Sequence, residues 1–369
     1  MRRGIRVLGL GLLVVMLLSF ASARADRSVV LTFAGDCTLG SEEALRDKDY
    51  SFDSYAARYG YDYFFAGFKD IFASDDLTLV NLEGVLSNSR STENRKKKYC
   101  FRGPADFAAI LSAGSVDAVS LANNHTSDYG SAGLADTRKA LEEHGIIWVQ
   151  NTVPYLYQQD NITVAVFGLD HGNLFDQWLL NEVRRLKASG EADAIVIFAH
   201  HGNEYRPGHE YFAADRSRRL VEAGADLILM HSPHVLQGMD VIQNRTVFYS
   251  LGNFVFGGNK TIRRISNPGV PEVSSLYTAV IQARLSFTGD GRYLGQRITV
   301  FPAYTSDDPE ANHYQPQRLT AQEAVPVRDA IQYDTPFELP ALTEKEGFAR
   351  MDFDYLPAFD DVLIPEDDE

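Results

Sequence analysis

The stretch Val29-Val-Leu-Thr-Phe-Ala-Gly-Asp36 predicts a buried strand that ends in a glycine and a carboxylate. All of its residues before the glycine are apolar except one threonine, which is typical of a strand covered on both faces. The same pattern, an apolar run followed directly by polar side chains, recurs four times along the chain. These later runs end in Asn81-Leu82-Glu83, Asn123-Asn124-His125, His200-His201-Gly202 and His231-Ser232-Pro233-His234.

Helical patterns separate these expected strands. Apolar residues recur at helical spacing in 64–74, 105–113, 131–144, 177–188 and 216–223. Regular alternation of strands and helices predicts an α/β layered architecture. Further strands are expected at 146–150, 162–168, 247–250, 276–287 and 297–300.

Three segments are expected along the chain. Residues 1–25 predict a signal peptide, 26–305 the main domain, and 306–369 a C-terminal extension with an acidic end. The extension is rich in Pro, Asp and Glu with weak periodicity, so we expect it to wrap the domain or to be partly disordered.

The N-terminus has the features of an export signal. Arg2, Arg3 and Arg6 precede the apolar run 7–20, and Ala23-Arg24-Ala25 supplies a small-x-small cleavage pattern. The run is short for a membrane span, which needs roughly 20 residues. We therefore expect cleavage after Ala25 and export to the periplasm, the cell surface or the medium. The alternative is an uncleaved N-terminal anchor.

Charge and cysteine content exclude other classes of protein. The 369 residues carry a formal net charge of −15, which argues against nucleic-acid binding through a general basic surface. The one basic run, 95–98, is interpreted as a solvated loop. Cys37 and Cys100 are too few for a disulfide scaffold or a cysteine-rich zinc site, and whether they pair with each other stays open.

The polar strand ends predict a metal site, because the carboxyl ends of strands in open α/β sheets form the ligand-binding edge. Their carboxylate, amide and imidazole groups form a mixed oxygen and nitrogen set. Such a set suits a divalent Mn, Fe or Zn ion better than Ca or Mg. The expected ligands are Asp36, Glu83, Asn124, His200, His231 and His234.

Each candidate also has a structural interpretation. Asp36 could cap a turn, Glu83 could belong to a buried ion pair, and Asn124 could make turn hydrogen bonds. His200 and His201 are adjacent and point opposite ways in an extended segment, so only one faces the site, and we favour His200.

The closing histidines leave two alternatives. His231 and His234 are three residues apart, and the intervening Pro233 prevents a regular helix. Both could bind metal, or one could orient the other.

At these residues the chain resembles the capsule-synthesis CapA family, also described as PgsA-like poly-gamma-glutamate synthesis proteins. That family belongs to the calcineurin-like metallophosphatase superfamily, so the resemblance implies a four-layer α/β/β/α sandwich. It rests on Phe33-Ala-Gly-Asp-Cys-Thr-Leu-Gly40, Asn81-Leu-Glu-Gly84, Ala122-Asn-Asn-His-Thr-Ser-Asp-Tyr-Gly130, His200-His-Gly-Asn-Glu-Tyr205, Gly224-Ala-Asp-Leu227, His231-Ser-Pro-His-Val235 and Tyr249-Ser-Leu-Gly-Asn-Phe254.

The resemblance implies a role for each position. Asp36 matches the first metal-binding Asp, Glu83 a bridging carboxylate, and Asn124 the metal-binding Asn. His125 matches the general acid, while His200 and the pair His231 and His234 match the remaining ligands. We also place three residues at the pocket wall: Asn253, which could instead cap a turn, Glu204 and His201.

The sequence departs from the superfamily pattern at four positions. Thr38 stands where a ligand His is typical, and Glu83 stands where Asp is expected. Met230 replaces a common Gly, and His201 replaces a common Trp. The missing imidazole at position 38 leaves the number of ions, one or two, open.

Three functions are compatible with these residues. The first is a role in capsule or poly-gamma-glutamate synthesis or export, acting on an anionic polymer and with capsule-synthesis membrane partners. The second is a metal-dependent hydrolase of a phosphoester or an amide-linked polymer. The third is a non-catalytic accessory protein. Arg263 and Arg264, or the group Arg216, Arg218 and Arg219, would supply local positive charge for an anionic ligand.

Overall fold

The structure, a computed structural model, describes residues 27–266, 268, 270 and 272–356. The expected signal peptide with its cleavage site after Ala25 and the acidic end at 365–369 lie outside the described residues. Across the described part of the chain, no helix combines the length and the apolar character needed to cross a membrane.

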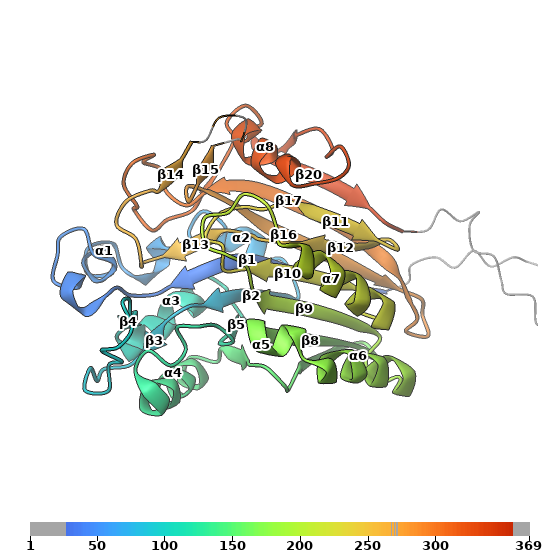
Figure 1. Cartoon of the computed structure of the whole chain (residues 1–369), viewed down its shortest axis with the longest axis horizontal. Helices are drawn as coiled ribbons and strands as arrows, with labels where there is room; N and C mark the ends of the chain where they lie inside the picture. The colour runs from blue at the N-terminus through green and yellow to red at the C-terminus, as the bar shows by residue number, and fades with distance from the viewer. Residues whose placement is uncertain (1–26, 267, 269, 271, 357–369) are drawn as a thin grey trace, which may run out of the picture.

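A ten-stranded sheet forms one half of the molecule (Figure 1). Its parallel part follows the order β1, β2, β5 and β6, and an antiparallel part continues from β1 through β16, β17, β20 and β19. Two short strands, β13 and β18, pair with β1 and β17. The bounds are β1 Arg27–Thr38, β2 Leu77–Leu82, β5 Ala118–Ser120, β6 Ile147–Val149, β13 Asn253–Phe256, β16 Tyr277–Phe287, β17 Tyr293–Tyr304, β18 Gln317–Arg318, β19 Thr343–Lys345 and β20 Phe348–Asp354.

A six-stranded sheet forms the other half, in the order β11, β12, β10, β9, β8 and β7. Its four central strands are parallel, and the two edge strands are antiparallel. The bounds are β7 Tyr155–Gln159, β8 Ile162–Asp170, β9 Ala194–His200, β10 Leu227–His231, β11 Met239–Ile242 and β12 Arg245–Phe248. Two further two-stranded ribbons join β3 (Val85–Leu86) to β4 (Arg102–Gly103) and β14 (Arg264–Ile265) to β15 (Val273–Ser274).

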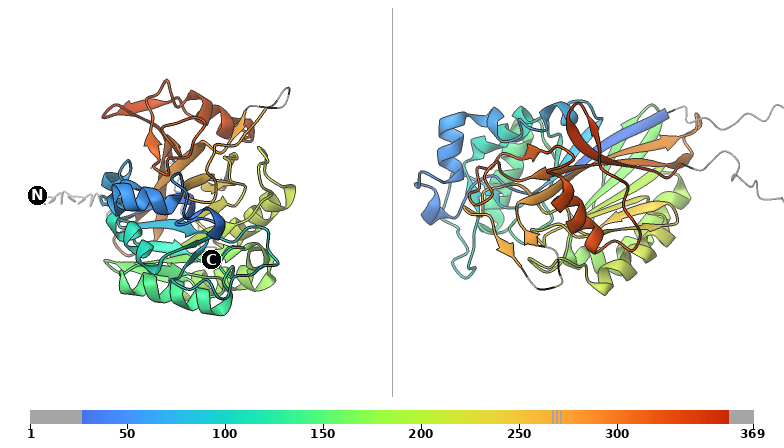
Figure 2. Two further views of the ribbon diagram at one scale, coloured as in Figure 1. Left: turned by 90° about the vertical axis from the view of Figure 1, so that its left-hand side faces the viewer. Right: turned by 90° about the horizontal axis from the view of Figure 1, so that it is seen from above.

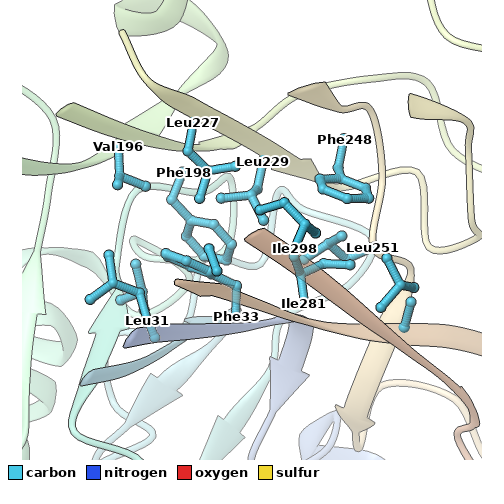
Figure 3. Packing of buried hydrophobic residues seen from close by; sticks show 14 of the residues in the cluster. Leu31, Phe33, Val196, Phe198, Leu227, Leu229, Phe248, Leu251, Ile281 and Ile298 are labelled. Carbon is cyan, nitrogen blue, oxygen red and sulfur yellow. The ribbon is translucent and has the colours of Figure 1, made fainter. Parts of the chain in front are cut away.

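The main hydrophobic core lies between the two sheets. Alternate residues of β1 point into it, and side chains of β9 and β10 meet them from the other sheet (Figure 3). The rings of Phe33 and Phe198 lie 5.8 Å apart in this core. Burial of this many aliphatic and aromatic side chains supplies the main stabilisation of the fold.

Helices cover the outer faces of the sheets (Figure 1). A second hydrophobic cluster packs α1 (Phe52–Tyr59), α2 (Lys69–Phe72) and α3 (Ala108–Ala113), together with α4 (Gly130–Glu143), against the ten-stranded sheet. A third cluster packs α5 (His171–Phe175), α6 (Gln177–Ser189) and α7 (Tyr211–Ala223) against the six-stranded sheet. The predicted α/β class is confirmed.

The C-terminal segment joins the same core. Helix α8 (Val325–Tyr333) places Val327 and Ile331 in the core between the sheets, and β20 pairs with β17. Figure 2 shows these segments, in orange and red, gathered along one side of the molecule. Residues 306–356 are therefore part of the packed domain. Because α8 enters the core between the sheets, it departs from a simple layered plan, and the four-layer description stays a prediction.

The helix expected at 64–74 is much shorter in the structure. Only Lys69–Phe72 is helical, although Phe64, Phe68 and Phe72 are buried on one side as expected. Gly67 accounts for part of the difference, because glycine is a poor helix former and a Cβ there would lie 2.4 Å from the carbonyl oxygen of Pro316.

Strand β1 connects two opposite ends of the molecule. The nine residue steps from Arg27 to Asp36 span roughly 30 Å at the usual rise of an extended strand. Arg27 pairs with Phe287, and the other end of the described chain lies nearby, where Tyr355 donates to the carbonyl of Gln296. Both ends of the described chain therefore lie on the face remote from Asp36 (Figure 1).

We expect Asp75→Asn to stabilise the protein at alkaline pH. Burial, with added repulsion from Asp117 and Asp76, raises the pKa of Asp75 to about 7, against 3.8 for the free side chain. The folded state therefore favours the protonated form, and stability falls as pH rises through 7. Urea unfolding should show the variant gaining on the wild type by roughly 1–2 kcal/mol between pH 5 and pH 8, allowing for partial exposure.

The exposed Asp62→Asn variant serves as the control for the change of Asp75. Its side chain is 81% exposed and its ion pair with Lys69 lies at the surface, so the variant should differ from the wild type by less than ~1 kcal/mol at either pH. If the free energy of unfolding of Asp75→Asn differed from that of the wild type by the same amount at pH 5 and pH 8, the raised pKa of Asp75 would be contradicted.

Candidate metal centre

Asp36 lies at the centre of the candidate site. Its side chain is fully buried at the carboxyl end of β1. One carboxylate oxygen, Oδ1, lies 2.9 Å from Nδ1 of His231 and accepts a 2.9 Å hydrogen bond from Nδ2 of Asn81. The other, Oδ2, accepts the backbone N–H of Ser232 at 3.1 Å and lies 3.3 Å from Nδ1 of His234. Asp36 thus connects the two sheets through one carboxylate.

Two groups of candidate ligands share Asp36. The first combines it with His200 and His231, and the second combines it with Glu83 and His234. Within each group the candidate ligand atoms all lie within 4.8 Å of one another, and all five side chains are buried. Five of the six expected ligands are therefore brought together around one carboxylate.

Glu83 and His231 carry buried polar atoms without partners. Both carboxylate oxygens of Glu83 and Nε2 of His231 form no hydrogen bond with the described residues. Oε1 of Glu83 lies 3.8 Å from Nε2 of His200 and 4.0 Å from Nε2 of His234, which is too long for a hydrogen bond. Unsatisfied buried groups are costly, and cations bound by the two groups of candidate ligands would satisfy them. The donor set therefore fits a divalent metal.

Burial and neighbouring charges shift the pKa values of Glu83, His234 and Asp36. Burial raises the pKa of Glu83 well above its usual value, and the negative charge of Asp36 adds to this effect. Burial would lower the pKa of His234, but Glu83 and Asp36 raise it to about 10. For Asp36 the hydrogen bonds from His231 and His234 outweigh burial and hold the pKa well below its usual range. The two carboxylates therefore disfavour each other's charge in this buried space, and a bound cation would favour the ionised form of Glu83.

The loop after β10 adopts an unusual backbone to place its donors. Ser232 has φ 117° and His234 has φ 58°, a region that side chains other than glycine rarely occupy. This conformation directs the N–H of Ser232 and the ring of His234 toward Asp36. The ring is also held by Asn253, whose Oδ1 lies 2.9 Å from its Nδ1. Asn253 thus contacts a candidate ligand directly.

Two glycines, Gly35 and Gly252, allow the segment before β13 to approach β1. The N–H of Asp36 donates to the carbonyl of Gly252 at 3.0 Å, and β13 pairs Asn253 with Asp36. A Cβ at Gly35 would lie 1.9 Å from the oxygen of Gly252, so no larger residue fits without separating the strands. Gly35 is therefore required for the position of its neighbour Asp36.

His125 is aimed at the same site from a different element. Its Nδ1 lies 2.7 Å from Oδ2 of Asp128, and its Nε2 lies 3.9 Å from Oε1 of Glu83. Asp128 is fully buried and also accepts the backbone N–H of Phe101 at 2.8 Å. A carboxylate behind an imidazole fixes the orientation of the ring, which suits a proton donor at Nε2.

Sequence reasoning missed Asp128 and Lys97. Nζ of Lys97 lies 2.5 Å from Oδ1 of Asp128, 3.5 Å from Nδ1 of His125 and 2.8 Å from the carbonyl oxygen of Asn124. The run 95–98, interpreted as a solvated loop, therefore sends one lysine into the site. The spacing of Asp128 three residues after His125 is a signal that could have identified it; the sequence contains no comparable signal for Lys97.

Two expected residues are exposed and do not belong to the buried group. Asn124 is exposed, whereas its neighbour Asn123 is buried and donates to Oδ1 of Asn81 at 3.0 Å and to the carbonyl of Leu82 at 2.8 Å. Glu204 is exposed. The roles expected for Asn124 and Glu204 stay predictions.

His201 points away from its neighbour His200. Its Nδ1 lies 2.8 Å from Nδ1 of His171, and its Nε2 lies 3.3 Å from Oε2 of Glu210. Burial, with a contribution from His171, lowers the pKa of His201 to about 4. The alternation along β9 therefore directs only His200 toward Asp36, and the expected place of His201 at the pocket wall stays a prediction.

The departures from the family pattern also have structural counterparts. The hydroxyl of Thr38 donates to the backbone carbonyl of Glu83 at 2.8 Å, so it supports the segment that carries Glu83. Met230 packs in the core beneath α5–α7. Cys37 and Cys100 are both free and buried.

Comparison with known proteins identifies several relatives. A family model described as "Bacterial capsule synthesis protein PGA_cap" matches residues 30–172 and 154–258. The "Capsule biosynthesis protein CapA" of Bacillus anthracis is 28% identical over 263 residues, covering 63% of this chain and 61% of that protein. The "PGA biosynthesis protein CapA" of Bacillus subtilis is 26% identical over 292 residues, covering 73% and 71%. Among solved structures, a phosphatase from Mycoplasma pneumoniae is similar with a TM-score of 0.41 and 11% identity, covering 78% and 96%.

Asp128→Asn should release the ring of His125 from its fixed orientation. An amide can present either an oxygen or an N–H to Nδ1, so the carboxylate's preference for a protonated Nδ1 is lost. Long-range 1H–15N spectra of the imidazoles should show a changed tautomer balance for His125. Loss of the buried charge-assisted bond should also lower stability by roughly 1–3 kcal/mol.

The pair of His209 and Asp334, with 2.9 Å between Nδ1 and Oδ2, provides an internal control in the same spectra. Its signals should not change. An unaltered His125 signal in the Asp128→Asn variant would show that the carboxylate does not orient the ring.

Proposed function

The chain belongs to the bacterial capsule synthesis protein family PGA_cap, and from this membership we propose that it acts in capsule or poly-gamma-glutamate synthesis or export through a divalent metal centre. The family model covers more than half of the chain and includes every candidate ligand. The alignment spans 61% of the length of the Bacillus anthracis relative, so the activity of a whole relative is carried over here only as a proposal. The signal-like N-terminus supports an exported location.

The partnerless oxygens of Glu83 are the observation that carries the metal centre. Neither oxygen of this buried carboxylate is hydrogen-bonded to a described residue, which is costly, and its Oε1 lies within 4.0 Å of Nε2 of His125, His200 and His234. Nitrogen and oxygen ligands together favour Mn, Fe or Zn. We propose that Asp36 is shared between two adjoining positions, one with His200 and His231 and one with Glu83 and His234, which would allow one or two ions.

The proposed chemistry is hydrolysis of a phosphoester or of a bond in an anionic polymer. A bound divalent ion would polarise such a bond and supply a nucleophile at neutral pH. The protein's own contribution is His125, which Asp128 and Lys97 hold with Nε2 directed into the site. This arrangement suits delivery of a proton to a leaving group. Membrane proteins of capsule synthesis are the partners that an exported member of this family would meet.

A non-catalytic accessory role is the second candidate. It is favoured by Thr38, which stands where a ligand imidazole would be typical and whose hydroxyl is used to support the backbone at Glu83. In that case the metal would shape a binding surface for an anionic polymer. The two candidates differ in whether the proton donor His125 matters.

Elemental analysis of the purified protein tests the metal centre. We expect Mn, Fe or Zn in the wild type and loss of all bound metal in Asp36→Asn, because both ligand groups include Asp36. His200→Gln should lose metal from one group. His201→Gln is the matched control, since it changes the histidine that follows β9 and points away from His200, and it should retain full metal content. A metal-free wild type that binds none of these ions on reconstitution would remove the proposal.

His125→Gln separates the two candidate functions. Metal content should be retained, because His125 belongs to neither ligand group. Turnover of ethyl phosphate, whose alkoxide leaving group must be protonated, should fall by roughly 100-fold or more in the metal-loaded variant if His125 supplies the proton. Full capsule production by a strain carrying His125→Gln would instead support the accessory role.

A further inference from the structure

Most of the arginines considered for anion binding already form hydrogen bonds or ion pairs within the protein. The guanidinium of Arg216 donates to the backbone carbonyls of Leu174 and Asp176, in the latter case at 2.5 Å. Arg218 pairs with Asp215 at 2.5 Å and with Glu222 at 2.8 Å. These two arginines therefore stabilise α7 and its contacts.

The neighbours Arg263 and Arg264 differ in this respect. Arg264 lies 3.6 Å from Glu272 in an ion pair and donates to the carbonyl of Pro309 at 3.1 Å. Arg263 is exposed and forms no ion pair with any described residue, and its guanidinium lies 3.8 Å above the ring centroid of Tyr205. Its positive charge is therefore available to a ligand.

Tyr205 places this charge beside the candidate metal centre. The ring of Tyr205 lies 5.9 Å from the ring of His234, so Arg263 is one aromatic side chain away from a candidate ligand. The backbone N–H of Tyr205 donates to the carbonyl of Pro233 at 2.7 Å, and its φ of 56° is in the left-handed region. The tyrosine is thus fixed to the same loop that carries His234.

The backbone of Arg263 is also fixed. Its N–H donates to Oγ of Ser275 at 2.9 Å, and its carbonyl accepts the N–H of Ser275 at 2.9 Å. Stacking on an aromatic face leaves the edge of the guanidinium, with its N–H donors, free to bind in plane. A guanidinium in this setting is suited to bidentate binding of a carboxylate or a phosphate.

We propose that Arg263, stacked on Tyr205, is the residue that selects substrates carrying an oxyanion next to the group bound at the metal centre. This inference rests on the proposed function, because it describes a subsite of that same centre. The chain has a net charge of −15 and Glu204 precedes Tyr205 in the sequence, so Arg263 is one of few cations here, beside Lys97 at His125 and Lys98 near Glu204. The substrate class is therefore a compound that carries a carboxylate or a phosphate beside the group bound at the metal centre.

Binding of short anionic probes tests the subsite. Isothermal titration would compare a γ-linked glutamate trimer, glycerol 3-phosphate, and the neutral glutamine counterpart of the trimer. In Arg263→Gln we expect the affinity for an anionic probe to fall about fivefold to tenfold, as for loss of one charge-assisted contact at an exposed site. Arg263→Lys should recover only part of the affinity, because an ammonium cannot bind an oxyanion in a bidentate manner.

Arg264→Gln is the matched control. It removes the same charge from the next residue, whose guanidinium is already paired with Glu272. It should bind every probe within about twofold of the wild type. Loss of affinity for both anions would support an oxyanion subsite in general, and loss for the trimer alone would identify it as specific for carboxylates. Equal binding by Arg263→Gln and Arg264→Gln, or equal binding of the neutral trimer by the wild type, would overturn the proposal.

Elemental analysis of the same samples distinguishes failure of the proposed metal centre from failure of the proposed Arg263 subsite. A protein without metal would contradict the metal centre, whereas the dependence on Arg263 is measured by titration whether or not metal is bound. A protein with metal but with no dependence on Arg263 would contradict the subsite alone.

Discussion

The buried carboxylate of Asp36 is the constraint on which the rest of the site depends. It accepts hydrogen bonds from the second strand of its own sheet and from the loop after β10 of the other sheet. Burying such a group is costly unless it is fully paired, so the surrounding elements must be in place for the carboxylate to be tolerated. The aromatic and aliphatic core between the sheets supplies the rigidity that holds the two halves in register. The geometry of the site therefore depends directly on how the two sheets pack against each other.

Much of this arrangement could be predicted from the sequence. Apolar runs marked the central strands, and polar residues at their carboxyl ends marked Asp36, Glu83, His200, His231 and His234, which the structure brings together. Their proximity could be predicted because the side-chain alternation of a strand and the polar residues at its carboxyl end can be read from the local sequence. The same alternation rule separated His200 from His201.

Other features could not be predicted because they depend on contacts between distant segments. Which of two adjacent asparagines turns inward is decided by Asn81, whose Oδ1 accepts from Asn123. The approach of Lys97 to Asp128 depends on the path of a loop with no periodic pattern. The C-terminal segment also looked irregular in sequence, yet Val327 and Ile331 complete the core and β20 extends the sheet. Tertiary contacts, and not local propensity, determine these placements.

The position of the chain ends has a practical meaning for experiments on surfaces. Arg27 and Tyr355 lie on the face remote from Asp36, separated from it by the length of β1 (Figure 1). A tag, bead or fusion partner joined directly at Arg27 or Tyr355 would therefore lie on the face remote from Asp36. Immobilised protein can thus be oriented without any change to the site, which permits binding to long chains to be measured at a surface.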